Sequence, residues 1–356
     1  MSSYDVVVIG GGAAGLSAAL VLGRARRTVL VVDSGAPRNA PAAHLHGYLS
    51  RDGLPPSELL AVGRDEVTGY GGTIVADTVT GVSPTEDGGF EVSTAEGHPI
   101  STRRLLVTTG LRDELPDIPG LGARWARDVL HCPYCHGHEV RDRPLGVIGG
   151  TPGAVRYAQT VRQWTDDLVY FSPAGVLTPT ERTELLARAI GVVEGAIEGL
   201  VVDAADHLRG VRMADGSVVP RDALFVPPRF VPNAGLLEAL GCETDENGWV
   251  VTDPTGLTSV PGVWAAGNVV DPRAQIITAA GAGSAAAIAL QADLVDDDVR
   301  RAVRDYEHGL PHRPTTHPNR RSHHDHPART PDQAPARADD LARGLPDPDR
   351  PQPGSR

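Results

Sequence analysis

The chain has 356 residues, a hydrophobic fraction of 40% and a formal net charge of −12 at pH 7. Its 33 lysine-or-arginine residues are all arginine, and the acidic balance disfavours broad electrostatic binding to nucleic acid or to anionic lipid. The length allows two domains of ordinary size and the composition allows packed cores, so we expect an acidic, soluble protein.

The start of the chain, MSSYDVVVIGGG, lacks the basic region, apolar run and cleavage site of an export signal. The longest apolar segments, such as residues 279–295, are interrupted and too short to span a bilayer. A cytoplasmic protein without a membrane partner is therefore the default expectation. Three cysteines in that compartment cannot form a disulfide framework, so a close pair indicates catalysis or metal binding.

Two segments of the chain have the pattern of a βαβ unit. In the first, residues 5–9 and 28–33 are apolar runs typical of buried strands, and residues 13–22 have the composition of a buried helix. The second begins with a strand at 145–148, passes through a glycine-containing turn into a helix that ends near Trp164, and returns as a strand at 168–171. Two βαβ units in one chain predict two related domains of the nucleotide-binding type.

The first glycine loop, GGGAAG at residues 10–15, follows a strand and opens a helix with G-x-G-x-x-G spacing. In this motif Gly10 suits the tight turn, Gly12 lets the backbone approach a pyrophosphate, and Gly15 allows close helix packing. Asp33, at the end of the next strand, is placed to accept hydrogen bonds from a ribose diol. The residues predicted to bind a dinucleotide here are Gly10, Gly12, Ala13, Ala14, Gly15 and Asp33.

The stretch HCPYCHGHE, residues 131–139, allows three interpretations. Cys-x-x-Cys-His fits a haem attachment signature, although the chain shows neither an export signal nor a small cytochrome-like domain. The set Cys132, Cys135, His136 and His138 contains zinc-ligand types, but four ligands within seven residues are closer together than in usual structural zinc sites. A redox disulfide between Cys132 and Cys135 fits a dinucleotide-binding context, so we predict no metal.

A later segment decides which dinucleotide is expected. GVWAAGNV at residues 262–269, followed by DPRAQIITAAGAG, resembles the closing FAD motif of the thioredoxin reductase family of pyridine nucleotide-disulfide oxidoreductases. The turn TTG at 108–110 matches the family's short strand-ending turn between its two domains, and the resemblance covers about residues 4 to 300. The family usually has G-D-V where this chain has Asn268, which replaces an anionic side chain with an amide.

The resemblance implies an α/β fold with two Rossmann-like, three-layer ββα domains of thioredoxin reductase type, and a homodimer. A discontinuous FAD-binding domain would comprise residues 1–114 and 247–304, and an inserted central domain would comprise residues 115–246. Residues 305–356, rich in histidine, proline and arginine, are expected to be a disordered tail. Further FAD-binding candidates are Arg38, Asn39, His46, Thr109, Gly110, Gly267, Asn268, Gln275 and Ile276.

The second glycine loop, GGTPGA at residues 149–154, departs from the dinucleotide pattern. Thr151 occupies the position of the middle glycine, and Pro152 removes a backbone N–H where a phosphate needs donors. The following strand ends in FSPA, residues 171–174, with neither an acidic residue for a ribose nor the arginine pair that the reductases use for a 2′-phosphate. We therefore expect a retained fold whose nicotinamide site is lost; an atypical site remains the alternative.

In the family, the Cys-x-x-Cys pair faces the flavin, which implies that Cys135 exchanges electrons with the ring and that Cys132 meets the substrate. His136 stands where the reductases have an aspartate acid/base. An imidazole with a pKa of about 6.5 can likewise accept and return a proton. His138 either orients His136 or lies at the surface.

These features together are similar to one branch of the family, the FAD-dependent dithiol oxidases of the gliotoxin and holomycin type, which close disulfides in sulfur-containing natural products. The resemblance implies a small-molecule dithiol as substrate, with O2 reduced to hydrogen peroxide. The alternative is an NAD(P)H-dependent thioredoxin or disulfide reductase, and a third hypothesis is a non-catalytic flavin redox sensor.

Overall fold

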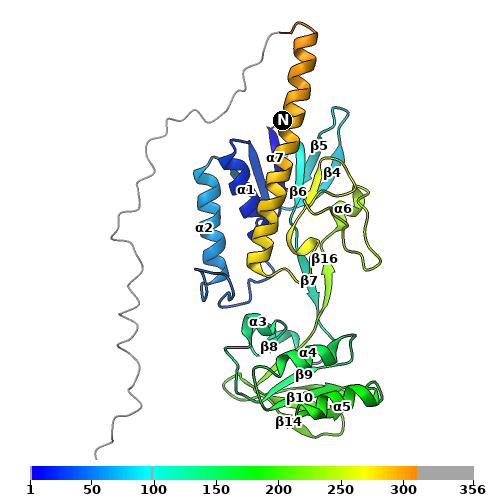
Figure 1. Cartoon of the computed structure of the whole chain (residues 1–356). Coiled ribbons are helices and arrows are strands. Elements are labelled where there is room, and N and C mark those ends of the chain that lie inside the picture. Colours follow the sequence, from blue (N-terminus) through cyan, green and yellow to red (C-terminus); the bar gives the residue numbers. More distant parts are fainter. Residues whose placement is uncertain (1, 98, 311–356) are drawn as a thin grey trace, which may run out of the picture. The chain divides into compact units, whose positions relative to one another are not determined.

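The computed structural model describes residues 2–97 and 99–310 of the chain (Figure 1). Most of the predicted tail therefore lies outside the described residues. Its predicted start at residue 305 is too early, because the last helix continues to Glu307. The predicted βαβ units are both present, with strands and helices within a few residues of their expected bounds.

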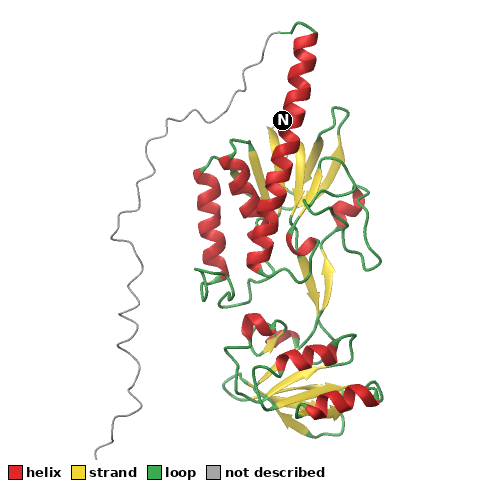
Figure 2. Cartoon of the chain, viewed as in Figure 1, coloured by secondary structure: helices red, strands yellow, loops and turns green. Residues whose placement is uncertain are grey.

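The first domain is built on one sheet with the strand order β3-β2-β1-β6-β5-β4, in which β17 also pairs with β6 (Figure 2). β1 is parallel to both β2 and β6, as a βαβ unit requires. The strands are β1 (Ser2–Ile9), β2 (Val29–Asp33), β3 (Thr73–Ala76), β4 (Val79–Pro84), β5 (Phe90–Thr94), β6 (Ile100–Val107) and β17 (Val263–Ala265). The helices are α1 (Ala13–Arg24), α2 (Pro56–Gly69), α6 (Gly235–Ala239) and α7 (Ile276–Glu307), with a 3-10 turn at Gly267–Val269.

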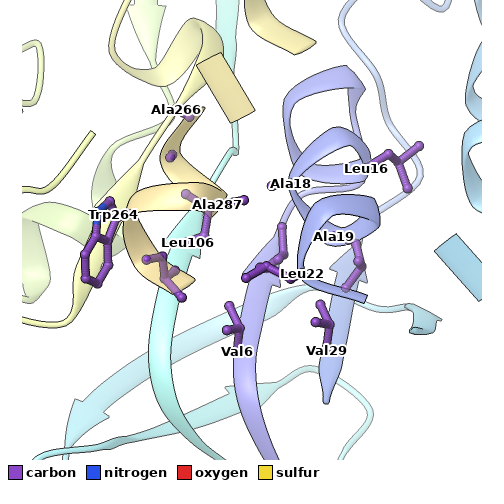
Figure 3. Packing of buried hydrophobic residues seen from close by; sticks show 14 of the residues in the cluster. Val6, Leu16, Ala18, Ala19, Leu22, Val29, Leu106, Trp264, Ala266 and Ala287 are labelled. Atoms are coloured by element: carbon purple, nitrogen blue, oxygen red, sulfur yellow. The ribbon is translucent and has the colours of Figure 1, made fainter. Parts of the chain in front are cut away.

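Alternate residues of β1 face two different cores. Val6 and Val8 pack under α1 and α7 with Leu106 and Trp264, the arrangement drawn in Figure 3. The intervening residues of β1 pack on the opposite face, with residues of β2, β5 and α6. Because both faces are covered, the continuous apolar run of this strand is explained by burial on both sides.

The central domain has three layers. Its parallel sheet has the order β11-β10-β9-β15-β8, helices α4 and α5 pack on one face, and a small antiparallel sheet of β12, β13 and β14 packs on the other. The strands are β8 (Val129–Leu130), β9 (Leu145–Ile148), β10 (Leu168–Ser172), β11 (Ile190–Glu194), β12 (Ile197–Val202), β13 (Leu208–Met213), β14 (Val218–Pro220) and β15 (Ala223–Phe225). The helices are α3 (Pro133–His136), α4 (Ala154–Val161) and α5 (Pro179–Ala187), with a 3-10 turn at Gly122–Arg124. This three-layer ββα arrangement confirms the predicted fold class.

Two strands connect the domains, β7 (Leu111–Glu114) and β16 (Arg229–Pro232), which pair antiparallel. The first agrees with the predicted boundary at residue 114. The second boundary, predicted at residue 246, differs from the packing, because Ala234, Leu237 and Cys242 are buried in the core of the first domain beside β1. This boundary could not be predicted from the sequence, because the apolar spacing of the short helix α6 does not indicate which sheet it covers.

Among the described residues, α7 alone is long and apolar enough to cross a membrane by length and composition. Its buried face packs in the core against α1. Its second half carries carboxylates that pair with β6: Arg103 contacts Asp297 and Asp298, and Arg104 contacts Asp293. These ion pairs hold the second half of α7 against β6.

The contact between α1 and α7 is close enough to test by adding one methyl group. An ideal Cβ at Gly283 would lie 2.0 Å from the carbonyl oxygen of Ala14, whereas a Cβ at Gly281 would meet nothing within 4 Å. We expect Gly283→Ala to lower the free energy of unfolding by at least about 2 kcal/mol, because a backbone atom blocks the added group. Gly281→Ala should raise it by about 0.5–1 kcal/mol through helix propensity.

Urea denaturation of the two apoproteins measures both effects. Equal unfolding midpoints for Gly283→Ala and Gly281→Ala would contradict the close crossing of the two helices.

Candidate active site

The first glycine loop is closed on its inner side and open at Gly12. Gly10 has a φ of +105°, and a Cβ there would lie 2.6 Å from the carbonyl oxygen of Thr108. A Cβ at Gly15 would lie 1.9 Å from the carbonyl oxygen of Gly10, whereas one at Gly12 would meet no atom within 4 Å. The loop thus packs against β6 and leaves space at Gly12 beside Ala13 and the N-terminus of α1, where backbone donors suit a phosphate.

Thr108 fixes this loop and was not predicted. Its hydroxyl donates to the carbonyl oxygens of Gly10 at 2.8 Å and Ile9 at 3.1 Å. Thr108 belongs to the TTG turn, in which only Thr109 and Gly110 were predicted to contact FAD. Thr109 instead donates to the carbonyl oxygen of Asn233 at 2.8 Å, and the Asn233 amide returns a bond to the Thr109 carbonyl oxygen at 2.9 Å.

Thr109 and Gly110 therefore fasten the strand that leaves the first domain to the strand that returns. The backbone N–H of Asn233 also donates to the carbonyl oxygen of Gly110 at 2.9 Å. Asn233 follows β16 directly and is separated from Thr109 by the whole central domain. No local pattern in the sequence points to this pairing.

Asp33 lies at the end of β2, as predicted, with its carboxyl group against the first loop. A Cβ at Gly11 would lie 2.7 Å from the Asp33 carboxyl carbon. The carboxylate is 2.9 Å from a guanidinium nitrogen of Arg64 on α2, and the Asp33 side chain is only 15% exposed. Arg64, which the sequence did not indicate, orients and neutralises the proposed ribose acceptor.

The closing segment meets the first loop from the other side. Gly267 has a φ of +78°, and a Cβ there would lie 3.0 Å from the Cβ of Ala14. The side-chain nitrogen of Asn268 donates to the carbonyl oxygens of Asp271 at 2.9 Å and Ala274 at 3.0 Å. These bonds need an N–H donor, which the amide of Asn268 supplies and an ionised aspartate would lack. They hold the turn that leads to Gln275, the N-cap residue of α7, and Ile276, its first residue.

Cys132 and Cys135 form a disulfide with a Cα–Cα distance of 5.2 Å. Cys132 is the N-cap of α3, and its sulfur accepts the backbone N–H of Cys135 at 3.1 Å. The sulfurs are bonded to each other, and the part of the chain that the structure describes contains no group of three or more His, Cys, Asp or Glu placed to hold a metal. Of the three interpretations, the geometry fits the redox disulfide.

His136 is the last residue of α3 and is half-buried. Burial lowers the pKa of its imidazole, His46 lowers it further, and the carboxylate of Glu139 opposes both effects. The ring is therefore neutral at neutral pH and can accept a proton from a thiol. His138 is exposed, and its carbonyl oxygen accepts a bond from Arg141 at 2.6 Å. Its catalytic role stays a prediction.

Arg38 and His46 both contact carboxylates of the protein, and their cofactor role stays a prediction. Arg38 makes a two-point bond to Asp113 at 2.7 and 2.8 Å, and its guanidinium lies over the ring of Phe230. The Nδ1 and Nε2 atoms of His46 are 3.3 Å from Asp52 and 3.5 Å from Glu139. Both side chains thus contact protein charges; Asp113 and Glu139 lie far from them in sequence, whereas Asp52 is only 6 residues from His46. Asn39 lies in the adjoining turn, where its carbonyl oxygen accepts the N–H of Ala42 at 3.0 Å.

His131, the residue before the cysteine pair, is enclosed by aromatic rings. It stacks on Trp125 at 5.8 Å between ring centroids and meets the ring of Phe230 edge-on at 5.9 Å. Burial and the nearby charge of Arg38, 3.3 Å from its Nε2, lower its pKa from 6.5 to about 4. Neutral His131 therefore belongs to the folded state at physiological pH.

The pKa of His131 predicts a pH dependence of stability. The unfolded chain takes up this proton near pH 6.5, whereas the folded chain takes it up near pH 4, so stability is lost as the pH falls through this window. The loss is on the order of 3 kcal/mol for a shift of this size. We expect His131→Phe to remove most of this pH-dependent loss of stability. His207→Phe, at an exposed histidine, should leave the pH dependence unchanged.

Urea unfolding of the two variants and the parent at several pH values between 4 and 7 measures the effect. If the free energy of unfolding of His131→Phe changed with pH as steeply as that of the parent, the lowered pKa would not belong to His131.

The second glycine loop packs closely at its first two glycines. An added Cβ at Gly149 would lie 2.3 Å from the phenol oxygen of the buried Tyr170, and one at Gly150 would lie 2.9 Å from the ring of Pro173. Thr151 and Pro152, which are exposed, stand at the positions that Gly12 and Ala13 have in the first loop. Tyr170 and Pro173 were not predicted to take part.

A family model for pyridine nucleotide-disulphide oxidoreductases matches residues 4–286. The chain belongs to this family. The crystal structure of HlmI has 58% sequence identity and a TM-score of 0.83, covering 86% of this chain and 97% of that one. A putative thioredoxin reductase TrxB from Bacillus anthracis has 33% identity and a TM-score of 0.79, covering 83% and 99%. The thioredoxin reductase sirT of Leptosphaeria maculans is 33% identical over 305 residues, covering 80% of this chain and 92% of sirT.

Membership in the pyridine nucleotide-disulphide oxidoreductase family confirms the thioredoxin reductase-like resemblance and makes the protein an FAD-dependent oxidoreductase. The residues fit the cofactor: the space at Gly12 and the N-terminus of α1 suit a pyrophosphate, and Asp33 held by Arg64 suits a ribose. The close approach of Gly267 to Ala14 brings the closing segment to the same site.

Gly12→Ala separates cofactor binding from folding. Because a Cβ at Gly12 meets no protein atom and the residue has an ordinary φ of −76°, we expect apoprotein stability to change by less than about 1 kcal/mol. The methyl group would occupy the space of the pyrophosphate, so FAD affinity should fall at least about tenfold.

Titration of apoprotein with FAD, followed by flavin fluorescence, measures this affinity. Unchanged affinity, or an unfolded apoprotein, would show that Gly12 does not line the cofactor site as proposed.

Proposed function

We propose that this protein is an FAD-dependent dithiol oxidase that closes an intramolecular disulfide in a small-molecule dithiol, with O2 reduced to hydrogen peroxide. The family supplies the FAD site and the redox cysteine pair. The residue pattern CPYCHG and the altered second loop resemble the natural-product dithiol oxidases of this family. We include a cytoplasmic homodimer in the proposal, on the family resemblance.

The observation that carries the proposal is the altered second loop. A nicotinamide cofactor needs backbone donors and free space at this loop. Here Thr151 places a side chain at the position of the middle glycine, and Pro152 lacks the backbone N–H at the next position. A reductase without access to NAD(P)H has no electron source, so electrons must enter from a dithiol.

The cysteine pair and His136 perform the chemistry on the substrate. His136 removes a proton from one substrate thiol, whose thiolate attacks the sulfur of Cys132, breaks the Cys132–Cys135 bond and forms a mixed disulfide. The second substrate thiolate attacks the substrate sulfur of that mixed disulfide and releases Cys132. Two electrons have then moved from the substrate to the cysteine pair. When bound, FAD supplies the two-electron chemistry that reoxidises the pair, with oxygen as the final acceptor.

Several relatives are thioredoxin reductases by name, among them sirT and tcpT of Claviceps purpurea, the latter 32% identical over 275 residues, and they favour a second candidate. This is an NAD(P)H-dependent disulfide reductase that serves thioredoxin or a similar carrier. It differs from the oxidase in one measurable respect, the source of electrons.

Anaerobic reduction of the holoenzyme discriminates between the candidates. We expect excess dithiothreitol to bleach the flavin absorbance within the time of turnover, and NADPH or NADH at physiological concentrations to leave it unchanged. In air, dithiol should drive oxygen consumption in multiples of the enzyme concentration. Fast bleaching by a nicotinamide would support the reductase, and a single reduction without turnover would support a redox sensor.

Cysteine variants test the assigned route. Cys132→Ser and Cys135→Ser should each lower dithiol-driven oxygen consumption at least about a hundredfold, because neither can form the protein disulfide. Cys242→Ala, at a buried free cysteine, serves as the control and should retain activity. Activity that persists in both serine variants would refute the mechanism.

A further inference from the structure

The last helix of the first domain carries a row of apolar side chains on its outer face. Among the described residues, α7 has more exposed large hydrophobic side chains than any other element. Val299 is 56% exposed and Ile288 is 62% exposed. The exposed apolar residues recur every three or four positions, so they lie on one face of the helix. We call this row the outer stripe; its members are Ile288, Ala292, Val295, Val299, Val303 and Tyr306.

The second half of α7 has its charges on the side where a surface helix normally has its apolar residues. Asp297 and Asp298 face the domain and pair with Arg103 at 2.7 and 2.6 Å. None of the residues 295–306 is buried, and Figure 1 shows this end of α7 extending past the sheet. A helix with only water outside turns its charges outward and its apolar residues inward. The inverted order indicates that another surface covers the outer stripe.

We propose that the outer stripe is the surface on which two copies of this chain associate, through an antiparallel pair of α7 helices that cross near residue 298. This inference rests on the homodimer included in the proposed function and names its interface. The outer face has small residues towards the start of α7, such as Gly281 and Ala285, and large ones towards its end, such as Val303 and Tyr306. An antiparallel pair packs the large side chains of one copy on the small ones of the other, whereas a parallel pair would place large on large.

Charge complementarity sets the register of this pair. Asp296 and Arg300 are exposed and, four residues apart, lie on the same side of the outer stripe. Within residues 2–97 and 99–310, Asp296 makes no ion pair, and Arg300 reaches only Asp297, at 3.5 Å. In an antiparallel pair the same flank of each helix meets. With the crossing midway between the two residues, Asp296 of each copy therefore faces Arg300 of the partner subunit.

The same register brings the apolar residues together. Tyr306 of one copy meets its partner at residue 290, which is as far before the crossing as Tyr306 is beyond it, so its ring packs beside Ala292 of the partner subunit. Val295 and Val299 pack at the crossing itself. A bilayer suits this face less well, because interfacial helices carry lysine and arginine beside their apolar face. Here Asp296 flanks the stripe and the chain has a net charge of −12.

Sedimentation velocity of the holoenzyme over a range of concentrations measures the association. We expect the parent to be a dimer and Val299→Glu to raise the dimer dissociation constant at least about thirtyfold, because an unpaired carboxylate would be buried at the crossing. Val299 is exposed in the single chain, so this variant should keep its flavin content and circular dichroism spectrum. Val202→Glu, at a valine of β12 that is 47% exposed, is the matched control and should remain a dimer.

A charge swap tests the register. Asp296→Arg alone places like charges across the interface and should raise the dissociation constant about three- to thirtyfold. Adding Arg300→Asp in the same chain reverses both members of each pair, which should restore the parental value to within about threefold. A double variant that associates more weakly than Asp296→Arg would overturn this register.

Cysteine cross-links test the direction of the two helices. In an antiparallel pair that crosses at residue 298, the two copies of Val299→Cys lie about 3 Å apart along the axis, whereas those of Tyr306→Cys lie about 24 Å apart. A disulfide needs Cα atoms within about 7 Å of each other. Mild oxidation should therefore link the copies of Val299→Cys and leave Tyr306→Cys unlinked, while a parallel pair would link both.

These outcomes are separate from those of the proposed chemistry, because association is measured without dithiol or oxygen. A monomeric parent overturns the inference, and binding of that monomer to vesicles of phosphatidylcholine and phosphatidylglycerol would assign the outer stripe to a membrane surface. A parental dimer that Val299→Glu leaves intact, or cross-linking of both cysteine variants, also overturns it. Dissociation by Val299→Glu in an enzyme that oxidises no dithiol would leave the α7 interface standing and refute the proposed function alone.

Discussion

The close contact of α1 with α7 and the segment before it is the constraint on which the first domain depends. Ala14, at the start of α1, is met by Gly267 and by Gly283, positions at which an added Cβ would lie 3.0 Å and 2.0 Å from its atoms. Ala14 thus lies beside residues that are more than 250 positions away in the sequence. The discontinuous domain, the insertion between β7 and β16 and the placement of the α7 N-terminus all follow from this contact.

The two glycine loops show how one topology can be kept while its binding function changes. Both loops follow the first strand of a βαβ unit and precede a helix. The first two glycines are tightly packed in both loops, with an added Cβ 2.6 Å and 2.7 Å from other atoms at Gly10 and Gly11 and 2.3 Å and 2.9 Å at Gly149 and Gly150. The loops differ at the next position, where the first has the open Gly12 and the second has Thr151 followed by Pro152. The turn between strand and helix is thus kept, while the residues that suit a phosphate are changed.

Burial sets the proton state around the cysteine pair. His131 and His136 both have lowered pKa values because their rings are withdrawn from water. His131 is held by Trp125, Phe230 and the Arg38–Asp113 pair, and so connects the redox helix to the strands that join the domains. His136 is left as a neutral base beside the disulfide.

The sequence by itself determined the elements and motifs that depend on neighbouring residues: the two βαβ units, the complete and the altered glycine loops, and the cysteine pair followed by histidine. These are local patterns of spacing and residue type, so they can be read without coordinates. Only the tertiary structure decided that Arg64 holds Asp33, that Asn233 fastens Thr109 and that Arg38 pairs with Asp113. It also decided that Ala234, Leu237 and Cys242 pack in the first domain. Each of these contacts joins residues distant in sequence, and a long-range contact is selected by the packing of whole elements rather than by any short pattern within them.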